Sequence, residues 1–289
     1  MIKKMIFAFT ALLVFVTSCS KSDDGQTTAR LTLNLNGLEE LGDDFVYEGW
    51  IIVDGSPVST GTFSSVVFPQ SFNVDADQLE KATTFVLSIE PAIDPDPAPA
   101  DTKILAGDFS GNQANVSSAG IVADFGDASG KYILATPTDG EDNNEFSGVW
   151  FLDLTSGSPA VGLDLPTLSD GWKYEGWAVI DGVPVSSGTF TDVADFDDNA
   201  MTTPFKGDLN DGPPYPGEDY LQNAPSGLTF PTDLRGATVV ISVEPYPDNS
   251  PAPFTLKPLA HMVPASADHH FTIDMGAGPV MYLEGMVSR

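Results

Sequence analysis

Cysteine and histidine are almost missing from this sequence of 289 residues, which has one cysteine and three histidines. A single cysteine cannot form a disulfide within the chain, so the fold must rest on its hydrophobic core. Basic residues are also scarce, because 12 Lys and Arg stand against 41 Asp and Glu, for a formal net charge of −29. Such a charge repels nucleic acid and anionic lipid headgroups, and we therefore expect no nucleic-acid partner.

Familiar catalytic motifs are missing as well. The sequence has no Gly-x-Ser-x-Gly elbow, no phosphate-binding glycine-rich loop with lysine, and no Cys/His pair. His269 and His270 are adjacent, and Asp268 and Asp274 lie nearby. These residue types are common metal ligands, so the segment is a candidate metal site. Side chains of adjacent strand residues point to opposite faces, however, so we expect diverging rings on exposed loop histidines. We predict no enzymatic activity, no cofactor and no metal.

The longest apolar stretch lies at the start of the sequence. Lys3 and Lys4 precede the run Met5–Val16, which is shorter than the ~20 residues of a membrane-spanning helix and has the form of a secretory signal. The following Val-Thr-Ser-Cys19 resembles the lipobox of bacterial lipoproteins. This resemblance implies cleavage before Cys19 and attachment of acyl chains such as palmitate to that residue.

Residues 1–18 are accordingly predicted to be a lipoprotein signal peptide, and residues 19–30 a flexible tether, because the latter are too polar to fold. Ser20, at the position after the lipidated cysteine, resembles lipoproteins sorted to the outer membrane. We expect a protein of the cell envelope, held in the outer membrane by the lipid on Cys19. Whether it faces the periplasm or the cell surface is left open.

The body of the sequence contains an internal repeat. Tyr47–Phe63 returns as Tyr174–Phe190, at an offset of 127 positions. Matches in the same order flank both copies. They pair Leu33–Leu38 with Leu163–Leu168, Phe85–Pro91 with Val239–Pro245, and Pro97–Pro99 with Pro251–Pro253. We predict a first domain at residues 31–155 and a second copy at 156–289, with an insertion at about 195–226.

Both copies have the pattern of β-strands. Leu31, Leu33 and Leu35 alternate with polar residues, Asp54-Gly55 predicts a hairpin turn, and Pro91 ends a strand because it lacks an amide donor. Further predicted elements are strands at Tyr132–Ala135 and Val149–Leu152 and a helix of one or two turns at Ala76–Lys81. The sequence therefore predicts an all-β protein of two tandem β-sandwich-like domains.

Two residue types recur at matching positions of the repeat. Trp50 and Trp177 alternate with apolar neighbours, so we interpret them as core anchors, with ligand-stacking platforms as the alternative. Glu90 and Glu244 are interpreted as partly buried carboxylates bonded to turns. A hydrolase would instead need two carboxylates to face each other in an open cleft. These would be Glu48 and Glu90, or Glu175 and Glu244 of the second copy.

The insertion at about 195–226 is the natural place for a function specific to the second copy. Its Tyr215 and Tyr220 are candidate ligand-binding residues. A carbohydrate-binding or adhesin-like surface lipoprotein is the alternative function, and it would require Trp172, Tyr215 and Tyr220 to form one exposed row.

The repeat resembles a known family. The shared features are the Tyr-Glu-Gly-Trp strand, the Asp-Gly turn, the Gly-x-Phe strand, the Glu-Pro strand end, the Pro-Ala-Pro segment and, in the first copy, Ile104–Gly107. Together they resemble the extracytoplasmic C-terminal domain of anti-sigma-K factors, although the second copy has Leu256–Ala260 in place of the Leu-Ala-Gly end. The resemblance implies a protein-binding or sensing module whose partner is an envelope protein or a glycan. Because we find no cytoplasmic helical domain, we expect no direct contact with a sigma factor.

Overall fold

The computed structural model describes residues 27–140, 143–246 and 250–289. The predicted all-β class is confirmed, because α1 (Ala76–Lys81) is the one α-helix of the described residues and all paired strands are antiparallel. The signal peptide, Cys19 and most of the predicted tether lie outside the described residues. Residues 28–30, also assigned to the tether, are already part of the first strand.

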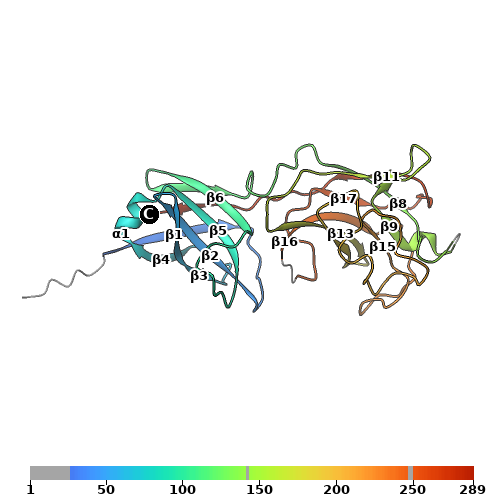
Figure 1. The fold of residues 1–289 in the computed structure, drawn as a ribbon, viewed down its shortest axis with the longest axis horizontal. Helices are drawn as coiled ribbons and strands as arrows, with labels where there is room; N and C mark the ends of the chain where they lie inside the picture. Colours follow the sequence, from blue (N-terminus) through green and yellow to red (C-terminus); the bar gives the residue numbers. More distant parts are fainter. Residues whose placement is uncertain (1–26, 141–142, 247–249) are drawn as a thin grey trace, which may run out of the picture.

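One large sheet of eight strands forms the first half of the molecule, on the left in Figure 1. Its order is β3-β2-β5-β6-β7-β20-β1-β4. The strands are β1 (Thr28–Asn36), β2 (Phe45–Val53), β3 (Ser56–Phe63), β4 (Gln70–Asp75), β5 (Thr84–Pro91), β6 (Lys103–Ser110), β7 (Gln113–Ser117) and β20 (Glu284–Ser288).

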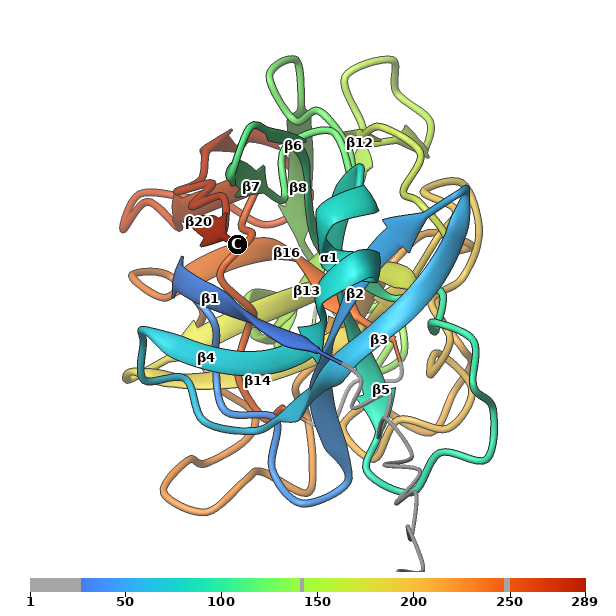
Figure 2. The same cartoon turned by 90° about the vertical axis from the view of Figure 1, so that its left-hand side faces the viewer.

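The sheet curls around a core of alternating strand residues. Leu31, Leu33 and Leu35 of β1 are at most 2% exposed, as their alternation predicts. The edge strands β3 and β4 approach each other, and the rings of Phe63 and Phe72 lie 5.7 Å apart. Figure 2, viewed from this end, shows β1, β4, β3 and β2 wrapping around with α1 across one opening.

The last strand of the chain belongs to this first sheet. β20 lies between β1 and β7 and pairs with both, and the red ribbon in Figure 1 runs back from the second half to reach it. Arg289 extends the link, because its guanidinium donates to the carbonyls of Leu79 at 2.6 Å and Ala82 at 2.8 Å, at the end of α1. The two ends of the described chain therefore complete one sheet.

The second half contains two sheets and a small ribbon. A five-stranded sheet has the order β14-β13-β16-β17-β19, and another joins β12, β8, β9 and β15, with β18 also paired to β8. The elements are β8 (Ser129–Leu134), η1 (Glu145–Ser147), β9 (Gly148–Trp150), β10 (Leu152–Asp153), β11 (Ala160–Val161), β12 (Leu163–Asp164), β13 (Trp172–Ile180), β14 (Val183–Phe190), β15 (Gly217–Asp219), β16 (Thr238–Pro245), β17 (Leu259–Met262), β18 (Ile273–Asp274) and β19 (Gly276–Ala277).

The strand pairing does not coincide with a division at residue 155. β8 and β9 precede that position, yet they pair with β12, β15 and β18 of the second half. β20 follows it but lies in the first sheet. The repeat boundary in sequence is thus not a boundary between sheets, because long-range pairing decides where each strand goes.

The repeated hairpins, in contrast, have the same geometry. β2 pairs with β3 and β5, and β13 pairs with β14 and β16, with a register shift at Gly49/Trp50 in one and Gly176/Trp177 in the other. Asp54 and Asp181 both have φ of 51°, followed by glycines at positive φ. Positive φ at both central positions is the type I′ turn that the Asp-Gly pair predicts.

The two halves meet where β6 and β13 begin. The Thr102 hydroxyl hydrogen-bonds the carbonyls of Gly171 at 3.2 Å and Tyr246 at 3.0 Å, and the Trp172 indole donates to the carbonyl of Lys103 at 3.3 Å. Gly171 has φ of +83°, and a Cβ there would lie 2.5 Å from the Thr102 nitrogen. The junction therefore requires a glycine, both for its positive φ and for the close approach of the Thr102 backbone.

Candidate functional site

The recurring tryptophan and glutamate of the first copy belong to one buried network. The Trp50 indole donates to the Ser88 hydroxyl at 2.8 Å, and that hydroxyl donates to Glu90. Glu90 also accepts the Ala100 amide at 2.9 Å. Trp50 is 3% exposed, and Ser88 and Glu90 are at most 1% exposed.

The second copy repeats this network. The Trp177 indole donates to Ser242 at 2.7 Å, Ser242 donates to Glu244, and Glu244 accepts the Phe254 amide at 2.9 Å. Ala100 and Phe254 are each the first residue after a Pro-Ala-Pro segment. The Glu-Pro strand end and the Pro-Ala-Pro segment thus recur together because the carboxylate holds the amide that follows the prolines.

The networks bear on the hydrolase alternative. A pair of catalytic carboxylates would face a cleft, but Glu90 and Glu244 are each 1% exposed. Burial raises the pKa of Glu90, against the lowering effect of its bonds from Ser88 and Ala100. Glu48 and Glu175 accept from hydroxyls on the neighbouring strands, Ser59 and Ser186. Glu48 and Glu175 therefore link neighbouring strands, while Glu90 and Glu244 hold the amide of a following loop.

We expect Ser88→Ala to lower the free energy of unfolding by about 1–3 kcal/mol, because it removes the partner of a buried indole and of a buried carboxylate. Ser242→Ala should cost a similar amount in the second copy. Urea unfolding followed by circular dichroism measures both. Changes below about 0.5 kcal/mol in both variants would show that the repeated network does not stabilise the fold.

The aromatic residues proposed for ligand binding do not form an exposed row. Tyr220 is fully buried and packs on Phe205 and Phe230 at 6.1 and 5.5 Å between ring centroids. Trp172 is 3% exposed, and Tyr215 is half-buried. Trp172 and Tyr220 fill the core. These three residues therefore do not present the exposed row of rings that would stack on a glycan.

The insertion instead contributes buried carboxylates that the sequence analysis missed. Asp197, Glu218 and Asp219 are at most 5% exposed. Burial raises the pKa of Glu218 to about 8 and that of Asp197 and Asp219 to about 6. Asp219 accepts the Trp150 indole at 2.7 Å and the Thr138 amide at 2.8 Å. Asp219 therefore ties β15 to β9 and to the loop after β8.

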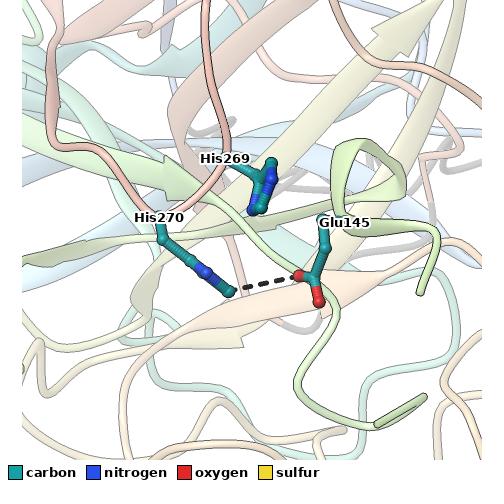
Figure 3. Close-up of side chains that lie close together, drawn as sticks. All are labelled: Glu145, His269 and His270. Carbon is teal, nitrogen blue, oxygen red and sulfur yellow. Dashed lines mark ion pairs between the residues drawn. The ribbon is translucent and has the colours of Figure 1, made fainter. Parts of the chain in front are cut away.

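Both histidines of the predicted loop lie close to one glutamate. Nε2 of His270 lies 3.2 Å from Oε2 of Glu145, and the rings of His269 and His270 are 5.0 Å apart. One ligand atom from each of Glu145, His269 and His270 lies within 4.8 Å of the other two. Figure 3 shows the three side chains close together, with the His270 ring directed at the Glu145 carboxylate.

The expectation of diverging rings was therefore wrong, and the backbone explains why. The histidines lie in a turn and not in a strand, and His270 has φ of +60°. The amide of His270 donates to the carbonyl of Leu134 at 2.9 Å, while Glu145 accepts the amide of Thr136 at 3.0 Å. The end of β8 thus positions both sides of the cluster.

A cavity of about 370 Å³ opens beside this cluster. Its lining includes Glu145 and His269 together with Phe146, Pro231, Thr232 and Asp233. The Phe146 ring meets the His269 ring edge-on at 5.4 Å, and the Arg235 guanidinium covers Phe146 at 3.9 Å. The cluster is therefore accessible from one side and walled by an aromatic ring on another.

Comparison with known proteins gives one family match. Residues 16–103 match the model of the family described as "Anti-sigma-K factor rskA, C-terminal". The match contains the whole Trp50–Ser88–Glu90–Ala100 network, so the predicted resemblance is confirmed for this segment, while its extension to the second copy stays a prediction. No curated protein and no solved structure matches the chain. Within the described ranges, no helix has the length and apolar character needed to cross a membrane.

Proposed function

We propose that this protein is a non-catalytic, lipid-anchored binding module of the cell envelope, built from two copies of the anti-sigma-K-type C-terminal domain. The observation that carries the proposal is the family match over residues 16–103. That family's domain lies outside the cytoplasm, as the resemblance implies. The recurrence of the same strand register and the same Trp–Ser–Glu–amide network supports a second copy of the domain.

A binding role is favoured over catalysis by the use made of the repeated carboxylates. Each accepts a hydrogen bond from a serine on its own or a neighbouring strand. Because these groups already serve the sheets, they do not supply an acid and base to a substrate. The formal charge of −29 favours a protein partner with a neutral or basic surface and disfavours nucleic acid.

The lipid at Cys19 explains why the module would act without touching a sigma factor. β1 begins at Thr28, so only a short stretch of chain separates the anchor from the first sheet. A lipid inserts into a single leaflet and does not carry the attached chain across the membrane, so the whole chain stays on one side. Both halves of the molecule would then work outside the cytoplasm.

We expect Cys19→Ser to abolish labelling by an alkyne analogue of palmitate and to move the protein from the membrane pellet to the soluble fraction. The reason is that the thiol is the attachment point of the lipid. Ser22→Ala, a change in the same tether, is the matched control and should behave as wild type. A Cys19→Ser variant that stays labelled and pelleted would refute the anchor.

The binding role has its own readout in the same cells. Formaldehyde crosslinking of the wild-type protein should give a discrete adduct with an envelope protein, and the yield should fall in Cys19→Ser as the local concentration falls. A membrane-attached wild-type protein that yields no adduct would count against a protein partner.

A further inference from the structure

We infer that Glu145, His269 and His270 form a binding site for a divalent transition metal of the zinc class. The inference concerns the second half of the molecule and does not depend on the lipid anchor or on the family match. Two imidazole nitrogens and one carboxylate oxygen form a donor set typical of zinc and its neighbours. Calcium and magnesium prefer all-oxygen sites, so they fit this cluster poorly.

The spacing of the ligand atoms suits a metal ion after a small adjustment. Bonds of about 2.0–2.1 Å to a tetrahedral ion place ligand atoms about 3.4 Å apart. The Nε2 of His270 and the Oε2 of Glu145 are already 3.2 Å apart, and all three ligand atoms lie within 4.8 Å. The His270 side chain is 50% exposed, so its ring has room to move toward the other two.

His269 supplies an independent observation. Its Nδ1 is buried and lacks a hydrogen-bond partner within the described part of the chain, which is costly for a polar atom unless something binds it. The other ring nitrogen, Nε2, lies 3.9 Å from Oδ1 of Asp268. A metal-bound histidine usually directs its second nitrogen at a carboxylate or carbonyl, which orients the ring. A metal ion on Nδ1 would satisfy the unpaired atom.

The carboxylate of Glu145 is also positioned to bind a metal ion. Glu145 is 7% exposed and is held by the Thr136 amide at 3.0 Å, so its position is fixed before any ion arrives. Three protein ligands leave a fourth coordination position, and two of the three proposed ligands, Glu145 and His269, line the cavity of about 370 Å³. We assign the open position to water or to a donor group of a binding partner.

The test is a calorimetric titration of the full chain in detergent with zinc chloride, in excess magnesium and calcium to occupy exposed carboxylates. We expect one zinc ion per chain. Glu145→Gln and His270→Asn should each weaken binding at least tenfold, since changes even in residues behind the ligands cost about 10–100-fold. Asparagine tolerates the positive φ of position 270, which keeps the turn intact.

His261→Gln is the matched control, because this third histidine lies on β17 and hydrogen-bonds Tyr132 at 3.0 Å, outside the cluster. It should bind zinc as wild type does. Zinc should also raise the melting temperature of wild type and His261→Gln, but not that of His270→Asn. No saturable binding at one ion per chain, or equal affinity in wild type and His270→Asn, would overturn the assignment. So would a loss in His261→Gln as large as in the cluster variants.

Discussion

Removing residues 284–289 should unfold the first sheet, although these residues follow the entire second half of the chain. β20 lies between β1 and β7, so its loss leaves two rows of unpaired backbone groups in the middle of the sheet. It also removes the fully buried side chain of Val287 and the Arg289 bonds to the end of α1. We expect a loss of more than about 5 kcal/mol, which is comparable with the whole stability of a typical domain.

Hydrogen exchange measured by mass spectrometry separates this result from general unfolding. In the truncated protein, amides of β1 and β7 should lose protection, while those of β13 and β16 keep it. A synthetic peptide of residues 282–289 should restore protection when added in excess. Met286→Ser, on an exposed side chain of the same strand, is the control and should leave the sheet intact. Full protection of β1 in the truncated protein would contradict the strand order.

Glu218→Gln should stabilise the protein at pH 8.5 and remove most of its loss of stability above neutral pH. Burial raises the pKa of the Glu218 carboxyl to about 8 from an ordinary value of 4.5. A raised pKa in the folded state means that the folded protein holds the proton more tightly. The stability linked to this group is therefore fully present below about pH 4.5 and is lost as pH rises through 8.

The size of the effect follows from the shift, because each unit of pKa corresponds to about 1.4 kcal/mol. We expect Glu218→Gln to gain a few kcal/mol over wild type at pH 8.5. At pH 5 it should lose about 1 kcal/mol, because an amide oxygen replaces only part of the hydrogen bonding with Thr203 and the Asp219 amide. Urea unfolding at both values measures this, with the exposed Glu40→Gln as control. If the free energy of unfolding had the same pH dependence in wild type and Glu218→Gln, ionising the Glu218 carboxyl would not destabilise the folded state.

The elements with a local signal were predictable from the sequence. The Asp54-Gly55 pair adopts the positive φ that its hairpin turn requires. Pro91 ends β5 because it has no backbone N–H. Asp75 caps the start of α1, because its side chain accepts the Gln78 amide at 2.9 Å. The repeat predicted that the two hairpins would be alike. Each of these features depends on residues close together in the chain, so a short stretch of sequence contains the information.

The features without a local signal were missed. Nothing in Glu284–Ser288 indicates that it joins a sheet begun at Thr28, because the pairing partner is set by the whole fold. The sequence does not show that His270 adopts positive φ, since no glycine marks the position. Glu145 lies far from both histidines in the chain, so the cluster emerges only when β8 brings the segments together.

We propose that the folded chain lies outside the cytoplasm, and the scarcity of cysteine allows a direct test. Ile93 is 92% exposed in the loop after β5, and the single native cysteine is expected to carry lipid. A membrane-impermeant maleimide, added to whole cells in which only the outer membrane has been permeabilised, should label Ile93→Cys to the same extent as after lysis, and should leave wild type unlabelled. Labelling of Ile93→Cys only after the inner membrane is broken would place the protein in the cytoplasm and contradict the account.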